Sequence, residues 1–326
     1  MAKIYDVFFY EAFKEEQEAI KKYLPKNINA GFSYKTIQET NSENPCSKII
    51  SIRTQSVIPE VWSDKISGIL TRSTGYDHIL RYLKKTNIKI PWGYLPLYCN
   101  RAVAEQALLL WLALYRKLFL QKNNFNLFHR DGLTGFESKN KNLLVVGVGN
   151  IGYEICKIGK GLEMNVFGVD IIKKHNDINY IDISEGLKIA DIIVCSMNLT
   201  NDNIGYFNYL RLKKAKKGVI FINVSRGEMS PSKDLLQLIK ENHLGGLALD
   251  VYNKEPKLAD ALRNKISTEN EEVLAAIELS KYSNVITTPH NAFNTFEAVE
   301  RKAKHSIEQI EYFLKNKRFL WAKKIK

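Results

Sequence analysis

The sequence predicts an α/β protein built from two units that each contain a parallel sheet. Short apolar segments alternate with segments of helical spacing over the first hundred residues, and a second series of the same kind begins near residue 143. The chain has 326 residues, which is enough for two modest domains. Hydrophobic residues make up 45% and charged residues 25%, so disorder is excluded for most of the length.

The first series supplies the elements of one unit. The predicted strands lie at 4–10, 48–52, 68–71 and 88–91. Helical spacing covers 11–24 and 77–83, and a polar turn follows the third strand at 72–75. A long helix is predicted from 100 to 120, and its apolar part at 102–118 indicates burial between domains or at a subunit interface.

The second series begins after a polar, glycine-containing segment at 123–140, which we expect to be a loop. Its predicted strands lie at 143–146, 166–169, 192–195, 219–223, 247–249 and 285–288. A helix is predicted at 153–162, and the long connection 257–280 has helical spacing near 273–279.

The composition of the sequence limits which binding partners and which cellular compartment we expect. The net charge of +13 is spread over small lysine clusters that do not form one block with interleaved aromatic residues, which is typical of a solvated surface and not of a nucleic-acid or membrane-binding face. The four cysteines are widely spaced and form no CxxC pair, so we expect reduced thiols and no metal site. No apolar run could span a bilayer and the N-terminus lacks a signal-peptide pattern, so a cytoplasmic protein is expected.

A glycine loop follows the strand at 143–146. Gly147 permits a tight turn, Gly149 lets the backbone approach a pyrophosphate, and Gly152 lets the next helix pack close to the strand. Asp170 closes the following strand, where a carboxylate accepts hydrogen bonds from the ribose hydroxyls of NAD and repels the 2′-phosphate of NADP. The context predicts an NAD site, although Lys173 and Lys174 would soften the discrimination against NADP.

Three loops that follow predicted strands carry the candidates for catalysis: Arg226, Glu255 and His290. A histidine suits proton transfer to a carbonyl oxygen because its pKa lies near about 6.5, and Glu255 would supply a carboxylate partner. Arg226 offers a planar fork for a carboxylate or a developing oxyanion. Taken singly, each residue also suits an ordinary ion pair or an exposed loop, and spacing alone does not bring them together.

Several segments, taken in order, resemble the D-isomer-specific 2-hydroxyacid dehydrogenase family: 75–79, 102–105, 147–152 with Asp170, 223–227, 249–256 and 288–290. The resemblance implies that Arg226 binds the substrate, Glu255 is the carboxylate partner and His290 is the acid and base. It implies cofactor contacts from Asn150, Ile151, Met197, Asn198, Asn203, Val224, Ser225 and Asp250. It also implies that backbone N–H groups at Thr74 and Gly75 bind the substrate carboxylate.

The same resemblance implies an architecture of two Rossmann-like, doubly wound domains, with the cofactor domain inserted into the substrate domain. We expect residues 1–99 and 292–326 to form the substrate-binding domain and residues 100–291 to form the NAD-binding domain. Members of the family are usually homodimers through the cofactor domain, and the apolar helix at 102–118 suits that use.

Two segments resemble D-lactate dehydrogenases within the family. Tyr98 stands in a segment where a tyrosine lines the substrate pocket, and Phe293 follows the histidine where an aromatic ring packs on a small side chain. Pyruvate and D-lactate are therefore the first expectation. The sequence leaves open glyoxylate, hydroxypyruvate, a branched 2-oxo acid or phosphite, and also a non-catalytic NAD(H)-sensing protein like the corepressors built on this fold.

Overall fold

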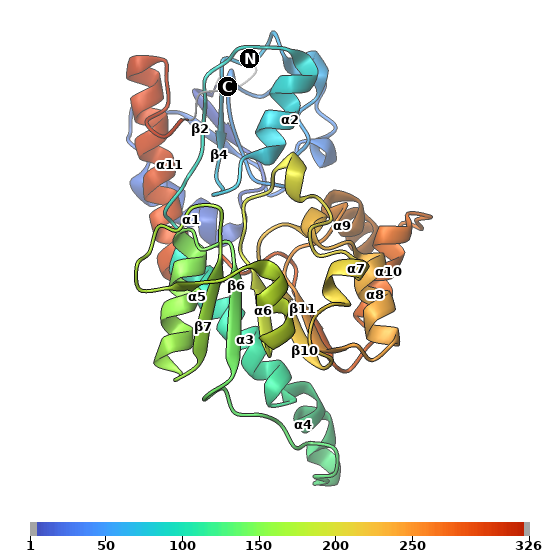
Figure 1. Cartoon of the computed structure of the whole chain (residues 1–326). Helices are drawn as coiled ribbons and strands as arrows, with labels where there is room; N and C mark the ends of the chain where they lie inside the picture. The colour runs from blue at the N-terminus through green and yellow to red at the C-terminus, as the bar shows by residue number, and fades with distance from the viewer. Residues whose placement is uncertain (1–4, 323–326) are drawn as a thin grey trace. The chain divides into compact units, whose positions relative to one another are not determined.

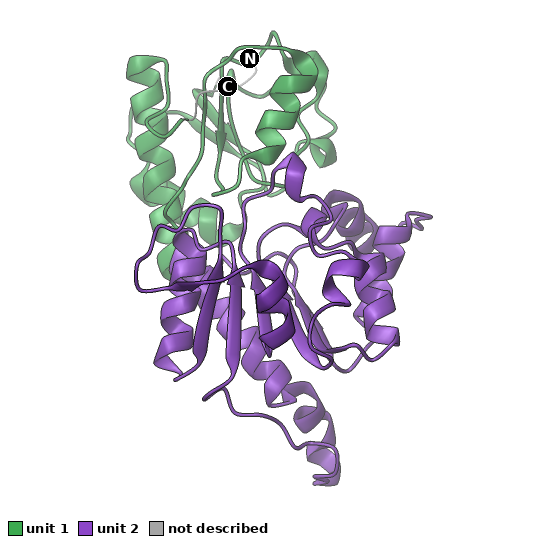
Figure 2. Cartoon of the chain, viewed as in Figure 1, with its two compact units in different colours: residues 1–99, 294–326 green, residues 100–293 purple. Residues whose placement is uncertain are grey.

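The computed structural model describes residues 5–322 and divides into two compact units (Figure 1, Figure 2). Unit 1 comprises Met1–Cys99 and Asn294–Lys326, and unit 2 comprises Asn100–Phe293. Unit 2 is thus inserted into the sequence of unit 1. Its C-terminal boundary lies between residues 293 and 294, whereas the sequence predicted a boundary between 291 and 292. Both sheets are wholly parallel, so the predicted α/β class is confirmed.

The sheet of unit 1 has five strands in the order β2-β1-β3-β4-β5. The strands are β1 (Val7–Phe9), β2 (Ala30–Phe32), β3 (Ile49–Ile52), β4 (Gly68–Thr71) and β5 (Trp92–Gly93). The order reverses between β1 and β3, which makes the carboxyl ends of these two strands the switch point of the sheet.

Helices cover both faces of this sheet. α1 (Lys14–Tyr23) packs along α11 (Phe296–Asn316), and α11 contacts β4. The other face packs under α2 (Asp77–Thr86) and the short helices η1 (Gln38–Thr40) and η2 (Glu60–Trp62), around a core that includes Tyr10, Ile50 and Trp62.

The sheet of unit 2 has seven strands in the order β12-β11-β10-β9-β6-β7-β8. The strands are β6 (Asn142–Val146), β7 (Asn165–Val169), β8 (Asn179–Tyr180), β9 (Ile192–Cys195), β10 (Val219–Asn223), β11 (Leu244–Leu249) and β12 (Val285–Thr287). The order reverses between β6 and β9, as in a dinucleotide-binding Rossmann fold.

The helices of unit 2 pack around this sheet. α3 (Asn100–Tyr115) contacts α5 (Asn150–Gly161) and strands β10, β11 and β12. The remaining helices are α4 (Leu118–Asn124), η3 (Phe125–Leu127), α6 (Ile183–Ile189), η4 (Asn201–Asn203), α7 (Tyr209–Leu212), η5 (Gly227–Met229), α8 (Ser232–Lys240), α9 (Glu255–Asn264) and α10 (Glu271–Leu279). Across residues 5–322, no helix combines the length and apolarity needed to cross a bilayer.

The structure corrects two predictions in the first half of the chain. The strand expected at 88–91 lies at Trp92–Gly93, because Pro91 has no N–H for a ladder and only its carbonyl pairs, with the N–H of Ile69. The helix expected to run from 100 to 120 ends at Tyr115, because Lys117 adopts a left-handed φ of 51°. α4 and η3 therefore occupy the start of the segment that we expected to be a loop.

Some elements were not predicted at all. β2 and β8 are short strands at the edges of their sheets, and a segment of this length carries little periodicity. α9 overlaps the start of the connection 257–280, and Leu258 is its one buried residue, so its sequence shows little apolar periodicity. Ile4, the first residue of the first predicted strand, lies outside the described residues.

A buried ionic cluster ties α1, β4 and α11 together in unit 1. The side chains of Glu16, Arg72 and Lys302 are all fully buried. One carboxylate oxygen of Glu16 contacts Arg72 Nε at 2.9 Å and Lys302 Nζ at 2.8 Å. Burial would raise the pKa of Glu16, but the charges of Arg72, Lys302 and Arg53 outweigh it and lower this pKa to about 2.

We expect Glu16→Gln to lower the free energy of unfolding by about 3–5 kcal/mol, because it leaves the buried Arg72 guanidinium without its counter-charge and removes the partner of Lys302. The folded protein holds Glu16 ionised, so the lost stability is the part present above pH 4.5 that declines as the pH falls toward about 2. Urea unfolding followed by tryptophan fluorescence at pH 7 and pH 3 measures both effects.

Glu18→Gln provides the control, because Glu18 lies exposed on the same helix and should change stability by less than about 0.5 kcal/mol. Equal unfolding curves for Glu16→Gln and Glu18→Gln would contradict the stabilising role of the cluster.

Candidate functional site

Most of the predicted functional residues lie at one edge of the unit 2 sheet. Six parallel strands end there, and each is followed by a candidate: Gly147, Asp170, Met197, Arg226, Asp250 and His290. Because the strands are parallel, their carboxyl ends share that edge. Arg226, Asp250 and His290 follow three adjacent strands, β10, β11 and β12.

The glycine loop has the geometry of a phosphate cradle. Gly147 adopts φ 93°, and a Cβ atom there would overlap the backbone of Met197. A side chain on Gly152 would clash with the carbonyl oxygen of Gly147. Gly149 faces open space, and within the described residues no side chain caps the N-terminus of α5 that it begins. The free N–H groups of this first turn and the space before them fit a pyrophosphate.

Asp170, the predicted ribose acceptor, holds the glycine loop. Its Oδ2 accepts a hydrogen bond of 2.6 Å from the backbone N–H of Val148, and its Oδ1 accepts one of 3.0 Å from Ile172. A carboxylate has further lone pairs beyond these two bonds, so it retains acceptors for ribose hydroxyls. The Val148 contact was not foreseen in the sequence.

The loop after β9 is braced by Asn203. Its side-chain amide donates to the carbonyl of Asn198 at 2.8 Å, and its side-chain oxygen accepts from the N–H of Thr200 at 2.8 Å. Ser196 donates from its hydroxyl to the carbonyl of Gly147 at 2.7 Å, which joins this loop to the glycine loop. Met197, the residue after Ser196, packs against the hydrophobic core of unit 2.

His290 and Glu255 are hydrogen-bonded. His290 Nδ1 lies 2.8 Å from one carboxylate oxygen of Glu255 and 3.0 Å from the other. A ring nitrogen that faces a carboxylate carries the proton, so Nε2 is the nitrogen that can exchange a proton with a substrate. Glu255 begins α9, and His290 adopts a left-handed φ of 53°.

Asp250 supports the loop that carries His290. The carboxylate is fully buried, and it accepts bonds from the Thr288 hydroxyl at 2.5 Å and from the N–H groups of Asn291 at 2.8 Å and Ala292 at 2.9 Å. Burial raises the pKa of Asp250 even though the charge of His290 and these donors act against it. The sequence suggested a cofactor contact for Asp250, which stays a prediction, and its side-chain hydrogen bonds in the structure go to the 288–292 loop.

Arg226 stands in a loop that is fixed from several sides. Asn223 donates from its side chain to the Arg226 carbonyl at 2.9 Å and to Ser230 Oγ at 2.7 Å. The Arg226 guanidinium donates to the carbonyl of Ser225 at 2.9 Å. Val224 is buried, and the hydroxyl of Ser225 lies 3.6 Å from the sulfur of Cys195.

Unit 1 holds the other candidates. The segment with Thr74 and Gly75 is fixed by hydroxyls, because Ser73 Oγ lies 2.6 Å from Thr71 Oγ1 and donates to the Gly75 carbonyl at 2.6 Å. His78 Nε2 lies 2.9 Å from Thr71 Oγ1 and extends this network, which the sequence did not indicate.

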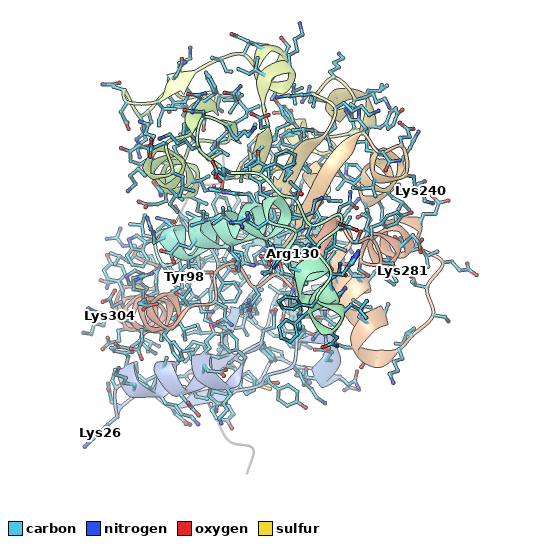
Figure 3. All side chains as sticks on the ribbon, turned by 90° about the horizontal axis from the view of Figure 1, so that it is seen from below. Lys26, Tyr98, Arg130, Lys240, Lys281 and Lys304 are labelled. Atoms are coloured by element: carbon cyan, nitrogen blue, oxygen red, sulfur yellow. The ribbon has the colours of Figure 1, made fainter. Side chains whose placement is uncertain are left out.

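Tyr98 is a buried residue of unit 1, and it lies beside α11 (Figure 3). Its carbonyl accepts a hydrogen bond of 2.9 Å from Arg301 Nε. Thr74 Oγ1 lies 3.6 Å from the sulfur of Cys99, the residue after Tyr98, so the segment with Thr74 and Gly75 is close in space to the segment with Tyr98. Phe293 is buried and is the last residue of unit 2.

The fold of unit 2, the glycine cradle and the terminal acid of β7 define a dinucleotide-binding oxidoreductase unit. Residues 108–292 match the family described as D-isomer specific 2-hydroxyacid dehydrogenase, NAD binding domain. The chain therefore belongs to the D-isomer-specific 2-hydroxyacid dehydrogenase family, as an NAD-dependent oxidoreductase that acts on a CH–OH group.

Three relatives illustrate the similarity. A 2-hydroxyacid dehydrogenase homolog of Zymomonas mobilis is 33% identical over 260 residues, which cover 75% of each chain. The D-lactate dehydrogenase of Escherichia coli is 26% identical over 309 residues, 89% of this chain and 92% of that one. The structure of an Aquifex aeolicus D-lactate dehydrogenase, with NAD and lactic acid, superposes with a TM-score of 0.83 at 24% identity, covering 98% of this chain and 100% of that one.

We expect Asp170→Ala to weaken NADH binding by about tenfold or more and to narrow the preference for NADH over NADPH. The variant removes both the ribose acceptor and the anchor of the Val148 N–H. Fluorescence titration with each dinucleotide measures the two affinities. Asp131→Ala is the control, because the Asp131 side chain is exposed to solvent. If Asp170→Ala left the ratio of the dissociation constants for NADH and NADPH unchanged, the ribose contact would be refuted.

Proposed function

We propose that this chain is an NAD-dependent D-2-hydroxyacid dehydrogenase that interconverts pyruvate and D-lactate. The observation that carries the proposal is the contact of His290 Nδ1 with both carboxylate oxygens of Glu255, in loops that follow β12 and β11, next to the loop after β10 that carries Arg226. This pair supplies an acid and base whose orientation is fixed, and the adjacent loop supplies a cation. The similarity to proteins named D-lactate dehydrogenase favours pyruvate within the family.

The proposed mechanism assigns one task to each residue. When bound, NADH supplies the hydride that is added to C2 of the 2-oxo acid. His290 gives the proton on Nε2 to the carbonyl oxygen, and the Glu255 carboxylate stabilises the imidazolium before that transfer. Arg226 holds the substrate and stabilises negative charge on the oxygen. In the reverse direction His290 takes the hydroxyl proton, so the same residues serve both directions.

The remaining residues of the proposal bind and orient. Backbone N–H groups at Thr74 and Gly75 hold the substrate carboxylate, while Tyr98 and Phe293 give the pocket an aromatic and mostly apolar lining. Such a lining suits the methyl group of pyruvate better than a phosphorylated or strongly polar chain. The proposed contacts to NAD come from Gly147, Gly149, Asn150, Ile151, Gly152, Asp170, Met197, Asn198, Asn203, Val224, Ser225 and Asp250.

The test is oxidation of NADH with pyruvate, glyoxylate, hydroxypyruvate, 2-oxobutyrate and 2-oxoisocaproate. We expect pyruvate to give the highest kcat/KM and its product to be oxidised only by an enzyme specific for D-lactate. A higher kcat/KM with another acid would keep the chemistry and reject the pyruvate assignment. Tight NADH binding without turnover of any acid would favour an NAD(H)-sensing protein instead.

The same assay tests the assigned acid. His290→Gln should lower kcat by about 10²–10⁴-fold, because the glutamine cannot transfer the proton, while NADH binding is retained. His129→Gln removes a solvated histidine and serves as the control. Turnover of His290→Gln close to that of the wild type would remove His290 from the mechanism.

We propose further that the protein is a homodimer through unit 2 and works in the cytoplasm. α4 projects from unit 2 (Figure 1), and the segment from α4 to Phe128 exposes several large apolar side chains: Leu118, Phe119, Phe125, Leu127 and Phe128. Phe125, Leu127 and Phe128 are each more than 70% exposed, so this arm presents an apolar patch of the kind that partners cover. All four cysteines are free thiols, which supports the cytoplasm as the compartment.

The double substitution Phe125→Ser/Phe128→Ser should weaken this dimer by more than about tenfold, because each ring contributes apolar area to the contact. Sedimentation velocity at several concentrations measures the dissociation constant. Leu262→Ser removes a side chain that is 60% exposed on α9 and is the matched control. A wild-type monomer, or a dimer unaffected by the double substitution, would overturn the proposed interface.

A further inference from the structure

The ionic cluster of unit 1 contains one cation more than its carboxylate needs. Arg72 already neutralises Glu16, and it also donates to the Tyr10 carbonyl at 2.6 Å and to Ser51 Oγ at 3.1 Å. Lys302 brings a second positive charge to the same oxygen of Glu16. Lys302 is fully buried, and burying an ammonium costs free energy unless other interactions offset that cost. Because Arg72 already neutralises Glu16, the charge of Glu16 alone does not account for a second buried cation.

Lys302 also faces the proposed substrate tyrosine. Its Nζ lies 5.7 Å from the centroid of the Tyr98 ring and 5.0 Å from that of the Phe13 ring. The preceding residue, Arg301, binds the backbone carbonyl of Tyr98. Consecutive residues of α11 therefore contact the backbone and the ring of the same tyrosine.

The place in the fold suits a ligand-binding role. Glu16 belongs to the helix that follows β1, and Arg53 directly follows β3, so the cluster lies by the switch point of the unit 1 sheet. Ligands of parallel α/β sheets bind at the carboxyl ends of strands where the order reverses. Tyr98 lies near this cluster, because the charges of Arg53 and Glu16 both act on its hydroxyl.

We propose that Lys302 is a positioning residue for Tyr98, whose ammonium, held by Glu16, fixes the tyrosine ring at the substrate loop of unit 1. The inference rests on the proposed function in one respect, namely that Tyr98 lines the substrate site. Attraction between the ammonium and the ring requires the charged form of Lys302. Substrate affinity should therefore depend on the protonation of a residue that takes no part in proton transfer.

The groups around Lys302 set the pH range of this effect. Burial lowers its pKa to about 7; Glu16 on α1 acts in the opposite direction, while Arg53 after β3 and Arg72 after β4 add to the lowering. The ammonium is thus present below pH 7 and is lost as the pH rises through that value. We expect the KM for the 2-oxo acid to rise between pH 6 and pH 8.

The first measurement is steady-state kinetics of Lys302→Met from pH 6 to pH 8. At pH 6 the variant should raise the KM for the 2-oxo acid by about three- to tenfold and leave the dissociation constant of NADH unchanged. Its KM should also lose the part of the pH dependence that wild type shows near pH 7. Lys304→Met is the control, because Lys304 lies exposed on the same helix (Figure 3) and should behave as wild type.

The second measurement does not depend on activity. Ring-labelled tyrosine NMR, with the Tyr98 signal assigned through Tyr98→Phe, reports the ring directly. The Tyr98 signal should shift with pH near 7 in wild type and in Lys304→Met, and it should not in Lys302→Met. An unchanged Tyr98 signal and an unchanged KM in folded Lys302→Met would overturn the proposal.

Two further variants keep the outcome decisive. Lys302→Arg retains the charge and should restore the low KM, whereas a purely structural role would not distinguish charged from neutral replacements of similar length. Lys302→Gln takes the place of Lys302→Met if the methionine variant does not fold. If wild type reduced no 2-oxo acid, the proposed function would fall, and the Tyr98 signal alone would decide whether Lys302 holds the ring.

Discussion

One constraint organises the chemistry of unit 2, namely that parallel strands deliver their carboxyl ends to a single edge. The central strands β9 and β10 are buried along their whole length, so polar side chains are largely excluded until these strands end, and they then gather at the edge where the parallel strands end together. This explains how Gly147, Arg226 and His290 share one edge although long stretches of sequence separate them. The helices and hydrogen-bonded loops hold that edge in shape.

Whether a strand is buried also decides whether the sequence predicts it. Central strands such as Gly68–Thr71 and Val219–Asn223 read as short apolar runs, and their predicted bounds are confirmed. The edge strands β2 and β8 are too short to show a pattern, and the end of α3 depends on a left-handed turn at Lys117. Such local turns follow from tertiary packing, which a pattern along one segment does not record.

The residues of the candidate site also fall into a group that the sequence predicted and a group that it did not. Residues that would touch a cofactor or substrate stand in recognisable segments, so the sequence singled them out. The residues that fix them do not, because their partners are distant in sequence: Asp250 holds the 288–292 loop, and His78 supports the segment around Gly75. Lys302 is the clearest example of a residue that the sequence did not indicate. A lysine in a helix is ordinarily expected to be exposed, whereas Lys302 is fully buried.

The left-handed backbone of His290 has an evolutionary consequence. A φ of 53° costs a histidine more than it costs a glycine, by roughly 1 kcal/mol. Random substitution under selection for stability alone would therefore drift toward glycine or asparagine at this position. Under the proposed mechanism the imidazole is retained only while selection acts on turnover, so lineages in which the reaction is no longer needed should lose this side chain early and keep their fold.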